Sequence, residues 1–106
     1  MDHQNLEEYE AASELLKLLA HPVRLCIVHG LWQHGGCNVS HMQECLGIPQ
    51  STISQHLAKL RAAGILSGTR NGLEIRYTLC NKTVERLLPA LFVGEPGRKN
   101  CESFHI

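Results

Sequence analysis

The sequence predicts a mainly helical fold with a small β-hairpin, a winged helix-turn-helix of about five helices and a two-stranded wing. Two consecutive helices are expected over residues 39–46 and 50–63, joined by a short turn, which is the helix-turn-helix pattern. Two strand-like stretches follow at about 65–70 and 73–79, separated by Asn71-Gly72. That dipeptide is the strongest short signal for a β-hairpin, and the hairpin supplies the wing.

The remaining helices lie on either side of this unit. A first helix is expected over residues 5–19, with acidic residues in its early turns that suit the positive end of the helix dipole. A second, over about 22–33, begins with a proline, whose missing N–H costs nothing in a first turn. Asn81 is a good N-cap for a fifth helix over about 82–93, and Pro89 inside it is expected to kink or weaken it.

The length of 106 residues suits one domain. We expect it to span residues 1–94, followed by a flexible tail over 95–106. A single core of this size is modest, so long apolar terminal helices would have reason to pair with a second copy. The sequence has no apolar run near the ~20 residues of a membrane span, and its acidic, polar beginning is unlike a signal peptide. A cytoplasmic protein without membrane contact is therefore expected.

The predicted fourth helix is amphipathic. Ile53, Leu57 and Leu60 recur at spacings of four and three and share an inner face. The opposite face carries short hydrogen-bonding groups and one cation, namely Ser51, Thr52, Ser54, Gln55, His56 and Lys59. Such groups can meet phosphates and base edges in a major groove, so double-stranded DNA is the expected partner.

The charge distribution supports this interpretation in part. The net charge is zero, which argues against nucleic acid. Residues 50–76, however, contain four cations and a single acid. The cations are Lys59, Arg61, Arg70 and Arg76, and the acid is Glu74. The local excess lies on the helix and wing, and it predicts moderate non-specific affinity.

The cysteine content is unusual for a small cytoplasmic protein. The five cysteines lie at positions 26, 37, 45, 80 and 101, and no two are spaced Cys-x-x-Cys. An odd count without an export signal argues against a structural disulfide framework. Cys26 and Cys80 are interpreted as packing residues. The others favour thiol chemistry or soft-metal binding.

Three cysteines and one histidine form the candidate sensing site. Cys37 lies in a polar turn before a helix whose N-terminus would lower its pKa. Cys45 follows His41 by four residues, so both share the outer face of the third helix. Cys101 lies in the polar tail, which could carry it to Cys37 or Cys45 of its own chain or of a second copy. A trigonal thiolate site or a reversible disulfide would follow.

Several segments together resemble the ArsR/SmtB family of bacterial repressors. They are Leu18 to Leu25, Val39 to Gly47, Gln50 to Leu57, Ala63 to Leu66 and Arg76 to Leu79. The resemblance covers roughly residues 12–93. It implies a homodimeric repressor that binds an inverted-repeat operator and leaves it when an inducer binds. It also implies that the first and fifth helices form the dimer interface.

The resemblance assigns roles by position. The residues matching the DNA-facing recognition helix are Gln50, Ser51, Thr52, Ser54, Gln55, His56 and Lys59. Arg70 and Arg76 match basic wing positions expected near the minor groove or its flanking phosphates.

The sensing sites usual in this family are altered. The Cys-Val-Cys pattern at the start of the third helix is replaced by Asn38 and Ser40 around a valine. Residues 82–93 lack His and Asp, which removes the zinc or nickel site of the fifth helix. Oxidant and persulfide sensors of this family have a cysteine in the second helix. The residue of this chain that aligns with that cysteine is His29. Any sensor in this chain is therefore a variant arrangement.

Two functions fit these residues, and a third does not. The preferred one is a repressor released by an inducer that is sensed through cysteine thiols. The inducer is either arsenite or a soft metal such as zinc or cadmium, or else an oxidant or a persulfide. No cofactor is expected unless the inducer is a soft metal or metalloid bound by the thiolates, such as arsenite, zinc or cadmium. The alternative is a winged-helix regulator without a small-molecule sensor, controlled by a protein partner or by abundance. An enzyme is not expected, because the sequence has no Cys-x-x-Cys, nucleotide-binding glycine loop or supported Ser-His-acid pattern.

Overall fold

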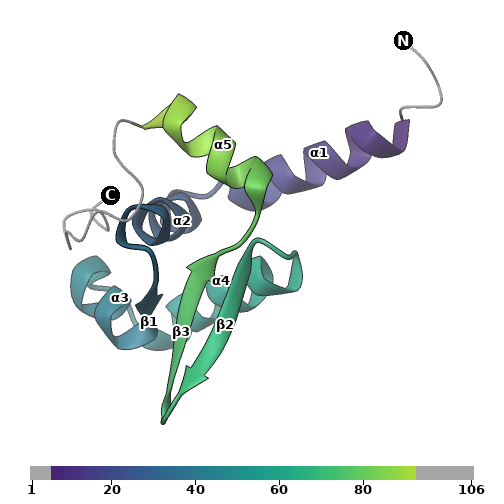
Figure 1. Ribbon diagram of the computed structural model, residues 1–106. Helices are drawn as coiled ribbons and strands as arrows, with labels where there is room; N and C mark the ends of the chain where they lie inside the picture. Colours follow the sequence, from purple (N-terminus) through teal and green to yellow (C-terminus); the bar gives the residue numbers. More distant parts are fainter. Residues whose placement is uncertain (1–5, 93–106) are drawn as a thin grey trace.

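The computed structural model describes residues 6–92, which form five helices and three strands (Figure 1). In chain order these are α1 (Leu6–Leu19), α2 (Pro22–His34), β1 (Cys37–Asn38), α3 (Val39–Leu46), α4 (Gln50–Ala62), β2 (Leu66–Asn71), β3 (Glu74–Leu79) and α5 (Lys82–Leu91). The helical body and the hairpin confirm the predicted winged helix-turn-helix. The predicted tail over 95–106, including Cys101, lies outside the described residues.

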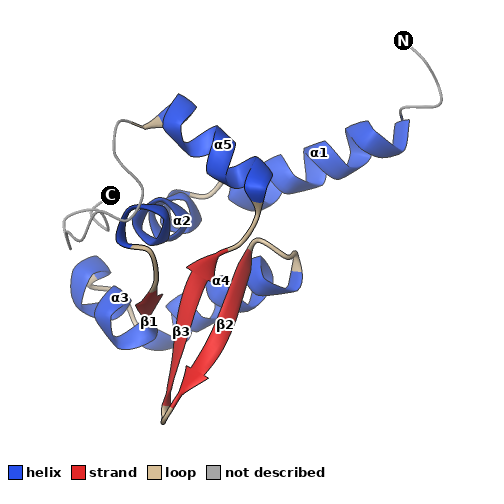
Figure 2. Cartoon of the chain, viewed as in Figure 1, coloured by secondary structure: helices blue, strands red, loops and turns tan. Residues whose placement is uncertain are grey.

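The core lies where α2, α3 and α4 meet the inner end of the hairpin and α5 (Figure 2). The largest side chains with less than 2% exposure come from all of these elements. They are Ile27, Val28, Leu31, Met42, Ile53, Leu57, Leu60, Ile65, Val84 and Leu88. Burying each such side chain contributes roughly 1.5–3 kcal/mol, so the recognition helix is anchored by three of the best-buried residues of the core.

Side chains cap three of the helices. His21 precedes α2, and its Nδ1 accepts a hydrogen bond from the Val23 N–H at 3.2 Å. Asn38 caps α3 through the His41 N–H at 2.8 Å. Asn81 caps α5, as its sequence position predicts, by accepting from the Val84 N–H at 3.1 Å. Such caps satisfy N–H groups that have no partner within the helix.

The turn between α3 and α4 depends on a glycine. Gly47 has a φ of +71° and donates its backbone N–H to the Gln43 carbonyl at 2.8 Å. This left-handed conformation ends a helix at little cost only when no Cβ is present. It directs the chain into α4, which begins three residues later.

The wing differs from the prediction at its tip. In the antiparallel ladder between β2 and β3, Leu66 lies opposite Leu79 and Asn71 lies opposite Glu74. The two-residue loop is therefore Gly72-Leu73, where Asn71-Gly72 was expected. Each strand accordingly begins one residue later in the sequence than predicted. A glycine at the first loop position also suits a tight hairpin.

The sheet has a third strand that sequence reasoning missed. β1 pairs antiparallel with β3, so that Cys37 lies opposite Tyr77 and Asn38 opposite Arg76, and the strand order is β1-β3-β2. Two residues are too few to show the alternation by which a strand is recognised. β1 ties the wing to the start of α3.

The two terminal helices lie together away from the wing tip, and α1 projects from the rest of the molecule (Figure 1). Leu6, Tyr9 and Leu16 are each about half exposed on α1. α5 continues through Pro89 and ends at Leu91, two residues earlier than predicted. No helix within residues 6–92 is long and apolar enough to span a bilayer.

Candidate nucleic-acid interface and cysteine sites

The two faces of α4 have the predicted composition. Ile53, Leu57 and Leu60 are at most 1% exposed and hold the inner face against the core. The exposed residues on the other side are Gln50, Ser51, Ser54, Gln55 and Lys59, while Thr52 and His56 are half-buried at its margins. A rigidly anchored helix therefore presents a continuous polar surface.

His56 also makes contacts inside the protein. Its Nδ1 lies 3.1 Å from Nε of Arg24, which comes from the first turn of α2. Its ring centroid lies 4.7 Å from that of His21. Burial lowers the pKa of His56, and the positive charges of His21, Arg24 and Lys59 lower it further. Sequence reasoning assigned no role to Arg24, because the contact spans 32 positions and no local pattern reports it.

α4 and the wing share one concave surface. A hollow of about 250 Å³ is lined by Gln50 and Ser54 of α4 and by Leu73 and Glu74 of the wing. One wall is fixed by a hydrogen bond of 3.0 Å from Nδ2 of Asn38 to the Glu74 carboxylate. The start of the recognition helix and the wing tip thus face the same space, as a surface that follows a duplex requires.

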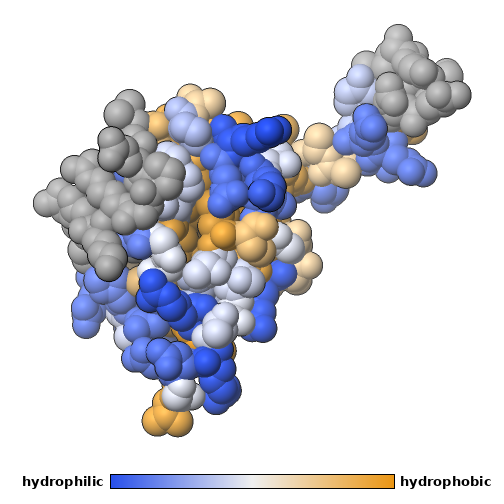
Figure 3. Space-filling model, viewed as in Figure 1, coloured by the Kyte–Doolittle hydropathy of each residue, from blue (hydrophilic) through white to orange (hydrophobic). Residues whose placement is uncertain are grey.

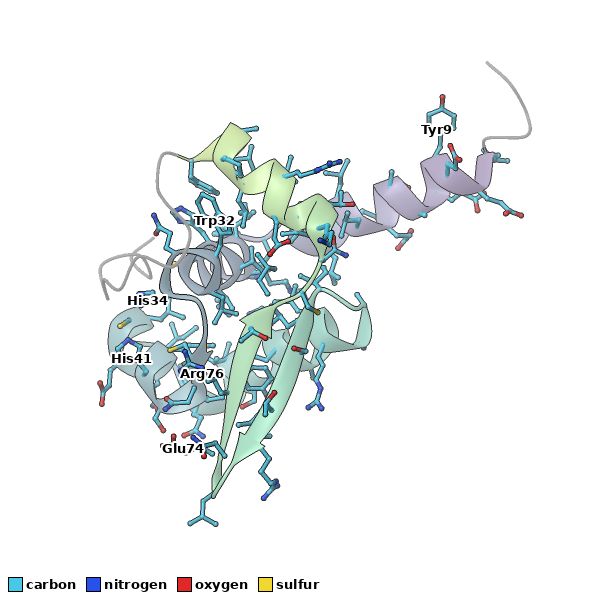
Figure 4. The ribbon with its side chains drawn as sticks, in the orientation of Figure 1. Tyr9, Trp32, His34, His41, Glu74 and Arg76 are labelled. Atoms are coloured by element: carbon cyan, nitrogen blue, oxygen red, sulfur yellow. The ribbon has the colours of Figure 1, made fainter. Side chains whose placement is uncertain are left out.

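The two predicted basic wing residues differ in position. Arg70 is exposed on β2, one residue from its end. Arg76 lies farther from the tip, and Figure 4 shows it with Glu74 on the side of β3 that faces α3. A Cβ added at Gly36 would lie 2.9 Å from Nε of Arg76, so the guanidinium packs against that glycine. Arg70 alone of the two projects near the tip.

The tip itself is apolar. Leu73 is 100% exposed, and the orange atoms at the lower end of Figure 3 mark the end of the wing beyond a mainly hydrophilic surface.

The structure corrects the interpretation of Cys37. This residue is 4% exposed and belongs to the core cluster. Burial raises the pKa of its thiol to about 11, and a backbone hydrogen bond with Asn38 and the charge of Arg76 offset only part of that effect. The predicted lowering by the helix N-terminus is therefore wrong, because β1 inserts the side chain into the core. Cys37 is a packing residue.

Cys45 and His41 lie together on α3, as their spacing predicts. Sγ of Cys45 lies 3.7 Å from Nε2 of His41, and the rings of His41 and His34 lie 5.9 Å apart, near the end of α2 (Figure 4). Cys45 is half-buried and disulfide-bonded. Cys101, the remaining candidate, lies outside the described residues.

The other two cysteines differ from each other. Cys26 is 7% exposed and burial raises the pKa of its thiol to about 11, in agreement with a packing role. Cys80 is a free thiol on the surface, so packing does not explain it, and its Sγ lies 3.5 Å from the Ile65 carbonyl oxygen. Within residues 6–92, no three His, Cys, Asp or Glu side chains converge on a common metal position.

An apolar groove separates α1 from α5. It measures about 390 Å³, and its lining includes Ala12, Leu15 and Leu16 of α1 and Leu87 and Ala90 of α5. Together with the half-exposed side chains of α1, it forms an apolar face at the end of the molecule opposite the wing.

These features define a winged helix-turn-helix DNA-binding protein. They are the recognition helix α4 with its inner face buried, the preceding helix α3 and its turn, and the adjoining hairpin. A family model described as a helix-turn-helix domain matches residues 19–69. The transcriptional repressor PagR of Bacillus anthracis is 43% identical over 91 residues, covering 86% of this chain and 88% of that protein. The chain belongs to the ArsR/SmtB family of transcriptional repressors, so it is a DNA-binding repressor and not an enzyme.

Solved structures agree with this assignment. The crystal structure of PagR superposes with a TM-score of 0.73 at 44% identity, covering 81% of this chain and 98% of that one. The repressor BigR from Xylella fastidiosa gives a TM-score of 0.73 at 36% identity, covering 86% and 93%. The repressor SmtB of Mycobacterium tuberculosis is 44% identical over 75 residues, covering 71% of this chain but only 55% of that protein.

Proposed function

We propose that this protein acts in the cytoplasm as a homodimeric repressor that binds an inverted-repeat operator and is released when an inducer reacts with a cysteine thiol. The observation that carries the DNA-binding part is the shape of α4. Its inner face is fully buried, and its polar outer face shares a concave surface with the wing.

The proposed DNA-contacting residues are the polar side chains of α4 together with Arg70 near the wing tip. Arg76, whose guanidinium packs against Gly36 farther from the tip, is expected to contribute less. Binding to the region upstream of the protein's own gene can be followed by gel shift or fluorescence anisotropy. Ser54→Ala or Gln55→Ala should each cost ~1–3 kcal/mol at the specific site. Lys82→Ala is a control, because this exposed residue lies on α5, away from the wing tip. Equal affinities for all four proteins would refute the assignment of α4.

The proposed dimer places a second copy on the apolar face of α1 and α5. The support is a groove of about 390 Å³ between these helices and the half-exposed Leu16 that lines it. Leu16→Glu should shift the protein to a monomer in sedimentation velocity, because a carboxylate would be buried at the contact. Leu73→Glu makes the same change at the wing tip and should leave association unchanged. A monomeric parent protein at micromolar concentration would contradict the proposal.

The proposed sensing thiol is Cys45, with His41 beside it and Cys101 as its redox partner. An imidazole at 3.7 Å can take the proton of a reduced thiol and so activate it. Two thiols and one peroxide then give a disulfide and two waters. A soft metal or arsenite bound by the same two thiolates is the other inducer chemistry. Cys37 is buried, which makes it a poorer candidate for sensing than Cys45 and Cys101.

The test measures operator release by arsenite, cadmium, zinc, peroxide and persulfide. Cys45→Ser and Cys101→Ser should abolish the response to one of these, whereas Cys80→Ser, which removes an exposed thiol, should not. Cys37→Ser is included as a buried comparison. If all four variants respond like the parent, thiol sensing through these residues is wrong, and a regulator controlled by abundance or a partner protein takes its place.

A further inference from the structure

The hydrogen bond between Arg24 and His56 determines which imidazole nitrogen carries the proton. The Arg24 guanidinium can only donate, and its Nε lies 3.1 Å from Nδ1 of His56. Nδ1 must therefore be the unprotonated nitrogen. In a neutral imidazole the proton is then on Nε2, which makes that nitrogen a donor.

Arg24 itself is held in place. A second nitrogen of its guanidinium, Nη1, donates to the Leu18 carbonyl at the end of α1 with a distance of 3.1 Å. The His21 ring packs on His56 from the same side, tilted by 58°. The residues that hold His56 thus come from the junction of α1 and α2, and they fix the ring against rotation from outside α4.

The surroundings also keep the imidazole neutral. Burial lowers the pKa of His56, and the charged groups that act on it are His21 and Arg24 from the α1–α2 junction and Lys59 from α4 itself. All three are cationic when charged, so each disfavours a second proton on the ring. Among residues 6–92, Nε2 of His56 makes no hydrogen bond and is not among the buried polar atoms without a partner.

We propose that Arg24 is a positioning residue for operator recognition, which fixes His56 as an Nε2–H donor at the edge of the DNA-facing surface of α4. His56 would then bind acceptors only, either a phosphate oxygen or a major-groove acceptor (O6 or N7 of guanine, N7 of adenine or O4 of thymine), and would discriminate against the amino groups of adenine and cytosine. This inference rests on the proposed function of α4 and adds to it the kind of DNA atom that His56 selects.

The tautomer can be read on the full-length free protein by long-range ¹H–¹⁵N NMR of the histidine rings. The parent should show His56 with its proton on Nε2 and with a pKa below that of an exposed histidine. Arg24→Met keeps the aliphatic stem and removes the donor, so the two tautomers should mix and the pKa of His56 should rise. Arg24→Lys retains a donor and should restore part of the parent pattern. A parent ring protonated on Nδ1 overturns the inference without any variant.

The consequence for DNA is measured on the footprinted operator. Arg24→Met should weaken binding about tenfold with an unchanged salt slope, because Arg24 acts through His56 and not on a phosphate. Scanning the operator with 7-deazapurines, with base analogues that lack O6 of guanine or O4 of thymine, and with methylphosphonates should reveal one position at which the parent is sensitive and His56→Ala is not. A changed tautomer with unchanged affinity, or no such position, overturns the role in recognition.

The two proposals fail in different ways. If Ser54→Ala and Gln55→Ala have no effect on binding, the assignment of α4 fails while the NMR result on the free protein stands. If those variants lose affinity but Arg24→Met leaves both the tautomer and the operator affinity unchanged from the parent, only the positioning role is overturned.

Discussion

Cys37 lies opposite Tyr77 in the antiparallel ladder between β1 and β3, with its side chain inside the core. This pairing has a chemical consequence. A thiol reacts through its thiolate, and burial raises the pKa of the Cys37 thiol to about 11. The residue therefore joins the wing to the helical body and is unsuited to sensing.

Alkylation of the reduced protein should follow this difference between cysteines. With N-ethylmaleimide near neutral pH, Cys80 should be modified before the two buried cysteines because it is exposed. Cys26 and Cys37 should remain protected, because each is buried and has a thiol pKa of about 11. Peptide mass mapping over time measures the order, and the same reaction in urea is the control. Modification of Cys37 as fast as Cys80 would show that β1 opens readily.

The success and failure of sequence reasoning follow the range of the interactions. The inner face of α4 was predictable because the spacing of Ile53, Leu57 and Leu60 repeats within a single helix. The cap by Asn81 and the hairpin were predictable because their signals are local. Such local patterns predicted all five helices and the hairpin, and missed only the short strand β1 among the elements of residues 6–92.

The contacts that decide the site are not local. β1 pairs with a strand about 40 positions later, and this pairing buries Cys37. The bond between Arg24 and His56 likewise joins distant segments. The packing of Arg76 on Gly36 is a third example, since sequence treated both wing arginines alike. Residue type and spacing therefore indicated the polar face of α4, but neither the role of Arg24 nor the direction in which the side chains of Cys37 and Arg76 point.

The wing arginines should differ in their effect on DNA binding. Arg70→Ala should lower the salt slope of operator affinity by about 0.9 for each phosphate that the protein no longer neutralises, because Arg70 is exposed near the tip. Arg76→Ala should leave the slope near that of the parent, because its guanidinium packs against Gly36. The slopes come from anisotropy titrations at several salt concentrations, with Lys82→Ala as a cation-removal control. A larger change for Arg76→Ala would place that residue on the DNA.

Gly36 should be intolerant of a side chain for two separable reasons. Its φ of +139° is rarely adopted by other residues, and a Cβ would lie 2.9 Å from Nε of Arg76. Gly36→Ala should therefore destabilise the protein by roughly 1–3 kcal/mol in urea denaturation. The guanidinium is the end of a flexible, exposed side chain and can shift, so backbone strain should dominate and the same change should cost nearly as much in an Arg76→Ala background. A much lower cost in that background would mean that the contact with Arg76 is rigid.

The stability of the protein should fall in acid partly because of His29. Its ring stacks on Phe92 with centroids 4.3 Å apart and lies 6.0 Å from the Trp32 ring. Its Nε2 is buried without a hydrogen-bond partner in the described part of the chain. Burial lowers the pKa of His29, so the folded state binds fewer protons than the unfolded state. The contribution of neutral His29 to the free energy of unfolding is therefore fully present above the unfolded pKa of about 6.5. It is lost as the pH falls toward and through the lowered pKa of the folded state.

His29→Phe tests this prediction because it keeps an aromatic ring on Phe92 and removes the titrating nitrogen. Urea denaturation between pH 4.5 and 8 should show a shallower pH dependence for the variant. At neutral pH we expect a gain of about 1 kcal/mol, since a buried polar atom without a partner is removed. His56→Gln serves as the comparison, because burial lowers the pKa of His56 in the same direction. If His29→Phe leaves the slope unchanged while His56→Gln flattens it, the acid sensitivity belongs to the recognition helix and not to the contact between α2 and the end of α5.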